Sequence, residues 1–125
     1  MNKKFFISYS KKDSEFAIRL ADNLQDAGHK IWIDRSLKVG ENWEQMIEKE
    51  LEKADAVIVI LSKNSIASKW VQHEGSMAYG LKKTMCPVLI ENVLPEDLPL
   101  WVNKFQYHSF LNTDYHVAFD SLNSI

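Results

Sequence analysis

The chain has 125 residues, of which 46% are hydrophobic and 26% are charged, as expected for one compact water-soluble domain. Its 15 basic and 17 acidic residues give a net charge of -2, which argues against a surface built mainly to bind nucleic acid or an anionic membrane. One cysteine, Cys86, excludes a disulfide framework, and no apolar run approaches the roughly 20 residues that span a bilayer. We therefore expect a cytoplasmic protein whose domain contacts neither nucleic acid nor membrane.

The first half of the chain predicts three strands and two helices. Each strand is a short apolar run, and each helix has apolar residues three and four positions apart. In chain order these elements are a strand over 5–9, a helix with apolar positions from 16 to 27, a strand over 31–33, a helix over 43–54 and a strand over 56–61. Asp13 is the expected N-cap of the first helix and Gly28 its stop, and a loop over 34–40 follows the second strand.

The second half continues the same alternation of helices and strands. A polar loop is predicted over 62–67, and a helix follows from about Ser68 to Gly80. The elements predicted after it are a strand over 85–90, mostly loop around Pro95 and Pro99, a strand over 106–109 and a helix over 115–122.

Strands that alternate with helices in this way indicate parallel β–α–β units. Five strands in a domain of this size predict an α/β fold, namely a flavodoxin-like three-layer sandwich with a five-stranded parallel sheet. Ligands of such sheets bind outside the carboxyl ends of the strands. The segments 8–11, 34–40 and 62–74 are therefore the places to look for a site.

Several familiar kinds of site are missing from those segments. The sequence contains neither a GxxxxGK[ST] phosphate loop nor a GxGxxG turn. No acidic residue follows the first strand until Asp13, so the Mg²⁺ site of a phospho-receiver is not expected. The four histidines have no metal-ligand spacing, and we expect no metal site.

The helix over 68–80 places an acid on its apolar side. At about 100° per residue, Glu74 lies within the arc that contains Trp70, Val71 and Ala78. A carboxylate in that arc must be paired, protonated or directed into a pocket, and on periodicity alone a structural glutamate is the commoner explanation. Trp70 lies one turn earlier on the same face, where it either packs in the core or borders a planar cationic ring.

Five segments in order resemble the TIR (Toll/interleukin-1 receptor) domain family. They match the family's first strand and turn, second strand, BB loop, W-x-x-x-E segment and proline-containing fourth strand, at 6–13, 28–34, 34–40, 68–74 and 86–88 respectively. The match runs from about Lys4 to Ile90, and the Gly-x-x-Trp pattern at 40–43 looks like bacterial members. Each segment alone is a weak signal, but their shared order and spacing make the resemblance specific.

The resemblance implies a flavodoxin-like enzyme that cleaves the nicotinamide–ribose bond of NAD⁺, giving nicotinamide and ADP-ribose or a cyclic ADP-ribose isomer. NAD⁺ is then the substrate, and no cofactor is expected. By position, Glu74 corresponds to the catalytic carboxylate, and the residues that border the substrate are Tyr9, Ser10, Asp34, Lys38, Trp43 and Trp70. Lys38 stands where some members have an acid, and Asp34 fits a second acid or a cap of the loop backbone.

The resemblance also implies partners. Members of this kind associate with other TIR domains, and the BB loop of one copy lies at the site of its neighbour. Leu37 and Val39 are the apolar loop residues that we expect at this contact. A fused or partner sensor domain would accompany the module, so residues 1–125 are interpreted as a single TIR domain, with a longer parent protein left open. The expected role is bacterial immune defence or virulence.

Two alternatives stay open. The first is a catalytically silent TIR module that acts as an adaptor or scaffold; Glu74, which many scaffolding members lack, favours the enzyme. The second keeps the fold and the glutamate but transfers a sugar to a nucleobase, as nucleoside deoxyribosyltransferases do. The resemblance of residues 34–40 to a BB loop disfavours that chemistry.

Overall fold

The computed structural model describes residues 2–33 and 43–125, with the backbone alone at 43 and 44. Within these residues, five parallel strands form one sheet in the order β2-β1-β3-β4-β5. The strands are β1 (Lys4–Ser8), β2 (Lys30–Ile33), β3 (Ala56–Leu61), β4 (Thr84–Leu89) and β5 (His108–Ser109). This strand order is that of flavodoxin-like sheets and confirms the predicted fold class.

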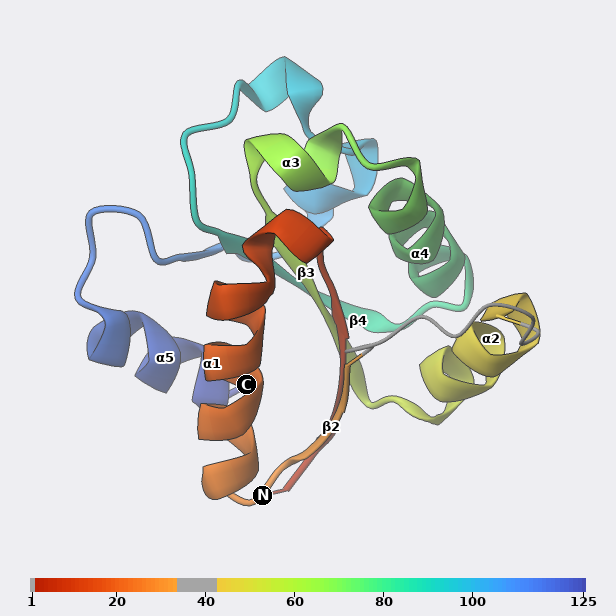
Figure 1. Ribbon diagram of the computed structural model, residues 1–125, viewed down its shortest axis with the longest axis horizontal. Helices are drawn as coiled ribbons and strands as arrows, with labels where there is room; N and C mark the ends of the chain where they lie inside the picture. Colours follow the sequence, from red (N-terminus) through yellow and green to blue (C-terminus); the bar gives the residue numbers. More distant parts are fainter. Residues whose placement is uncertain (1, 34–42) are drawn as a thin grey trace.

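Helices cover both faces of the sheet, and the longer ones are α1 (Ser14–Asp26), α2 (Trp43–Lys53), α4 (Lys69–Gly80) and α5 (Tyr115–Asn123). Figure 1 shows α1 and α5 on one face and α2 and α4 on the other. Along β1, Phe5 and Ile7 pack on the α1 face and Phe6 on the α4 face, as the two-residue period of a strand requires. In the described part of the chain, no helix is long and apolar enough to cross a membrane.

Both ends of α1 lie where the sequence predicts them, but the N-cap residue makes no capping bond through its side chain. Gly28 follows the helix with a φ of +99°, and a Cβ there would lie 2.9 Å from Asn2 Oδ1, so glycine ends the helix as expected. Asp13 occupies the N-cap position but makes no side-chain cap. Its carboxylate accepts instead from Ser62 Oγ at 2.5 Å and from Asn64 Nδ2 at 3.4 Å, because these donors lie within reach after β3.

A short helix, α3 (Lys63–Ile66), lies where a polar loop is predicted. Ser62 Oγ accepts from Ser65 N at 3.0 Å, and Ser65 Oγ accepts from Ser62 N at 2.8 Å. This is a reciprocal capping box with serine in the place usually taken by Glu or Gln. The prediction of a loop was wrong because two serines satisfy the helix end as a longer polar pair would.

The segment around the two prolines also contains structure where mostly loop is predicted, namely the 3-10 helices η2 (Pro95–Asp97) and η3 (Leu100–Lys104). Trp101 of η3 packs in the core on the α4 face of the sheet. Gly75 permits this approach, because a Cβ at Gly75 would lie 3.3 Å from Trp101 Cζ2. The following strand, β5, has two residues and is shorter than the predicted strand.

Candidate active site

Glu74 lies at the carboxyl edge of the sheet, on the side of α4 that faces β1. Ser68 begins α4 by accepting a hydrogen bond from Val71 N through its Oγ, at 3.3 Å, which satisfies one amide of the first turn. Glu74 follows six residues after Ser68 and is 3% exposed. This burial confirms the position predicted from helical periodicity, inside the apolar arc of the helix.

The Glu74 carboxylate is hydrogen-bonded to the last residue of β1. Ser8 Oγ donates to Glu74 Oε1 at 2.7 Å, and both side chains are buried. Burying a carboxylate is costly unless its oxygens are satisfied, and a hydrogen bond to an ionised group is stronger than one between neutral groups. Sequence reasoning missed Ser8, although its two-residue spacing from Phe6 places it on the same buried face, where a hydroxyl needs a polar partner.

A recess of about 30 Å³ opens beside this pair, lined by Ile7, Tyr9, Lys11, Trp70 and Glu74. Trp70 is 37% exposed, so its indole is a partly open wall of the recess, not filling of the core. Exposed Lys11 contributes an ammonium group that the sequence analysis did not include. The recess therefore combines a buried acid, an aromatic face and a cation at the carboxyl end of β1.

The two predicted substrate residues after β1, Tyr9 and Ser10, have different surroundings in the structure. Tyr9 is buried and lines the recess with Glu74. Ser10 begins the 3-10 helix η1 (Lys11–Asp13), where its Oγ accepts a hydrogen bond from Lys12 N at 3.4 Å. The structure thus gives Ser10 a capping contact and brings Tyr9, Trp70 and Glu74 together.

The other predicted residues belong to the segment after β2. Asp34, Leu37, Lys38 and Val39 lie outside the described residues, and Trp43 begins α2 with its backbone alone described. Their contacts with substrate or with a second copy stay predictions.

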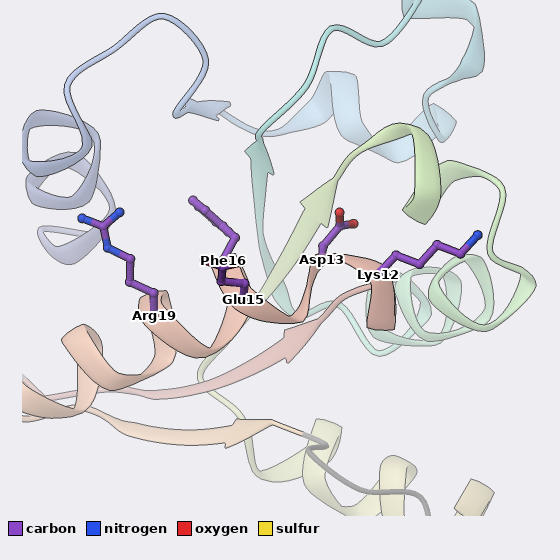
Figure 2. Close-up of a pocket in the computed structure, with 5 residues that line it drawn as sticks. All are labelled: Lys12, Asp13, Glu15, Phe16 and Arg19. Atoms are coloured by element: carbon purple, nitrogen blue, oxygen red, sulfur yellow. The ribbon is translucent and has the colours of Figure 1, made fainter.

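A larger depression of about 340 Å³ runs along η1 and the start of α1, lined by Lys12, Asp13, Glu15, Phe16 and Arg19. Figure 2 shows Arg19 and Phe16 reaching toward α5 and Lys12 pointing the opposite way. The Arg19 guanidinium lies 3.7 Å from the centre of the Tyr115 ring, a cation–π contact, and Asp13 is bound to Ser62. Because Arg19 and Asp13 are engaged in these contacts and no buried acid is among the described residues that line it, the larger depression is the weaker candidate for a reactive site.

Other reactive residue types lie elsewhere in the fold. Burial raises the pKa of the Cys86 thiol to about 12, so this thiol is protonated and inert at neutral pH, as expected for a structural cysteine. Burial also lowers the pKa of His108, which keeps its imidazole neutral there. No group of three or more His, Cys, Asp or Glu side chains in the described part of the chain could hold a metal ion.

These features define an α/β domain with a flavodoxin-like sheet and one buried carboxylate beside a recess at the carboxyl edge of that sheet. The sequence pattern of the TIR domain matches residues 5–123, which is nearly the whole chain. The chain therefore belongs to the TIR domain family, as its sequence segments predict.

Two bacterial relatives and one solved structure show what the chain is similar to. The NAD(+) hydrolase TcpC of Escherichia coli O6:H1 is 43% identical over 72 residues, which are 56% of this chain and 24% of that protein. The 2′ cyclic ADP-D-ribose synthase BtTIR of Bacteroides thetaiotaomicron is 33% identical over 72 residues, which are 56% of this chain and 25% of that protein. The matched segment is thus about a quarter of the length of each relative.

The solved structure is the TIR domain of the Toll-related receptor TRR-2 from Hydra magnipapillata. It is 22% identical, with a TM-score of 0.78 over 94% of this chain and 92% of that one. At this identity the likeness shows a shared fold.

Proposed function

We propose that this domain cleaves NAD⁺ at the bond between nicotinamide and ribose, with Glu74 as the catalytic carboxylate. The observation that supports this most directly is the buried Glu74 carboxylate, bonded to Ser8 at 2.7 Å beside the partly exposed Trp70 indole. The two bacterial relatives are named for NAD(+) hydrolysis and for 2′ cyclic ADP-D-ribose synthesis, and both names agree with this chemistry.

The charge of the substrate explains why one carboxylate suffices. Nicotinamide is already cationic in NAD⁺, so it leaves with the bonding electron pair as a neutral molecule and needs no general acid. The transition state places positive charge on the ribose, as in other glycosidic cleavages. Glu74 stabilises that charge electrostatically, and its burial strengthens the effect because little water screens it.

Trp70, Tyr9 and Lys11 complete the contacts that the recess offers. The Trp70 indole is the surface against which the cationic nicotinamide ring stacks. Tyr9 borders the ribose, and the Lys11 ammonium is suited to the diphosphate. We place Asp34, Lys38 and Trp43 at the substrate by family position, and Ser10 near the phosphates on the same ground.

Two products follow from the same first step. Water that adds to the ribose C1′ gives ADP-ribose and one proton, and Glu74 can accept that proton as a general base. A hydroxyl of the same molecule that adds instead gives a cyclic ADP-ribose isomer and one proton. NAD⁺ is the substrate in both cases, and the reaction needs no further cofactor.

Self-association is part of the same proposal. Leu37 and Val39 of the BB-loop segment are the residues that we expect between TIR domains, and a sensor domain in the same or a partner protein is expected to drive the assembly. We further propose that the domain acts in bacterial immune defence or virulence, in the cytoplasm. The support for these points is the family resemblance.

The test is chromatography of NAD⁺ incubated with the purified chain across a protein dilution series. We expect nicotinamide to appear as NAD⁺ is lost, with a specific activity that rises with protein concentration. Leu37→Asp should suppress that rise, whereas Leu94→Asp, at an exposed leucine after β4, should leave it unchanged. A folded chain that releases no nicotinamide at any concentration would favour the adaptor alternative instead.

A further inference from the structure

We propose that Ser8 is a positioning residue for Glu74, whose hydroxyl holds the carboxylate ionised and fixes the direction of its Oε1 atom. This inference rests on the proposed function for its role in the reaction. It concerns a hydrogen bond between residues 66 positions apart in sequence, one on a strand and one on a helix.

The sheet fixes where the Ser8 hydroxyl lies. Ser8 ends β1, pairs with Val59 of β3 and is 1% exposed, so both its backbone and its side chain are held by packing. Glu74 is held in turn by the buried face of α4. Because both ends belong to rigid elements, their 2.7 Å contact sets the rotamer of Glu74 in the folded protein. The entropy of ordering this side chain is then lost on folding and not again when substrate binds.

A hydrogen bond donated by Ser8 would favour the charged carboxylate. An ionised carboxylate accepts hydrogen bonds and donates none, and a serine hydroxyl has one proton to donate. A donor to the charged form makes protonation harder. Burial acts in the opposite sense, because it disfavours charge, so the Ser8 hydroxyl offsets part of the cost of the site's own desolvation.

Other described groups also lie near Glu74. Tyr9 and Lys11 line the same recess from the end of β1 and from η1, and Lys11 is exposed, so water and salt weaken its field. On α4 itself, Lys69 and His73 are exposed to solvent. The buried side chains that α2 and β3 contribute to this face of the sheet are apolar, namely Ile47, Leu51, Val57, Val59 and Leu61.

The test compares Ser8→Ala with Ser65→Ala, which removes another buried serine hydroxyl, in α3. We expect the acidic limb of the pH profile of kcat to move up by about one pH unit in Ser8→Ala, with KM little changed. At pH values below both midpoints this shift is a loss of about tenfold in kcat. Ser65→Ala should keep the wild-type profile, and Ser8→Thr, which keeps a hydroxyl, should restore it.

A second readout needs no turnover. The ¹³C resonance of the Glu74 carboxyl carbon, titrated by NMR without substrate, should reach its midpoint about one pH unit higher in Ser8→Ala than in wild type. If Ser8→Ala does not fold, Ser8→Cys fills the same space with a weaker donor and should move the midpoint in the same direction.

The outcomes distinguish the positioning role of Ser8 from the proposed cleavage of NAD⁺. A folded Ser8 variant with the wild-type titration midpoint and the wild-type pH profile overturns the positioning role of Ser8, even if NAD⁺ is cleaved. A wild type that releases no nicotinamide overturns the proposed function, and the NMR midpoints then decide whether Ser8 holds the carboxylate ionised.

Discussion

Two acids at the carboxyl edge of the sheet each accept a hydrogen bond from a serine at the end of a strand. Asp13 accepts from Ser62 after β3, and Glu74 accepts from Ser8 at the end of β1. The surroundings of the two pairs differ. Asp13 is partly exposed, accepts a second bond from Asn64 and joins η1 to α3, whereas Glu74 is buried and faces a recess beside Trp70.

The comparison shows that hydrogen-bonding chemistry alone does not identify a reactive acid. Both carboxylates are satisfied, but a charge acts more strongly on a ligand where water is excluded. Glu74 has that environment, because it is 3% exposed beside the Trp70 indole. Asp13 also borders a depression with an aromatic residue, Phe16, but it is partly exposed, so water is less fully excluded from its carboxylate. We therefore expect substitutions around Glu74 to change NAD⁺ turnover and substitutions around Asp13 to change the free energy of unfolding.

Among Trp70, Asp13 and His108, the largest effect is expected at Trp70, the aromatic wall of the recess. Trp70→Ala removes a cation–π contact of about 1–2 kcal/mol, so KM for NAD⁺ should rise about tenfold, with a smaller change in kcat. Steady-state kinetics across NAD⁺ concentrations measures this split. Trp70→Phe keeps an aromatic face and should retain most of the affinity. An unchanged KM in Trp70→Ala would show that the Trp70 indole does not contact the substrate.

Asp13→Ala should act on stability. It removes the bonds from Ser62 Oγ and Asn64 Nδ2, and we expect the free energy of unfolding to fall by about 1–2 kcal/mol. Chemical denaturation measures this loss, with Asp97→Ala as a control at an exposed acid of η2. NAD⁺ turnover by the folded variant should stay within about threefold of wild type. Loss of turnover without loss of stability would place Asp13 in the reactive site and contradict the distinction between a structural Asp13 and a reactive Glu74.

The smallest effect is the pH dependence of stability at His108, far along the sheet from both acids. Burial lowers the pKa of His108 in the folded protein, so the unfolded chain binds a proton more readily. Stability from this residue is therefore full above its ordinary pKa of about 6.5 and is lost as the pH falls through and below that value. His108→Gln should flatten the decline in unfolding free energy as the pH falls from about 7 to about 5. An equally steep decline in His108→Gln would contradict this assignment.

Short-range patterns in the sequence were enough for much of this structure. Helical periodicity placed Glu74 in the buried arc, and the apolar run at 56–61 predicted β3 with its bounds. The Ser8–Glu74 bond was not predictable in the same way, because it depends on the register between a strand and a helix 66 residues apart.

The other errors have the same origin. Asp13 occupies the predicted N-cap position, but its carboxylate binds Ser62, which follows β3, and makes no capping bond to the helix. The capping box of α3 uses Ser65 where Glu or Gln is usual, and the packing of Trp101 on Gly75 joins two segments that no local pattern links. Local periodicity thus predicts which side chains are buried, while the partner of each polar group depends on the tertiary fold.

The measurement that tests the central claim most directly is nicotinamide release from NAD⁺ by wild type and Glu74→Gln, at matched concentrations and with matched circular dichroism. Glu48→Gln, at an exposed glutamate of α2, is the control for the same chemical change. We expect release by wild type and by Glu48→Gln, and at least a hundredfold less by folded Glu74→Gln, because the charge that stabilises the transition state is gone. Release by folded Glu74→Gln at the wild-type rate would contradict the account.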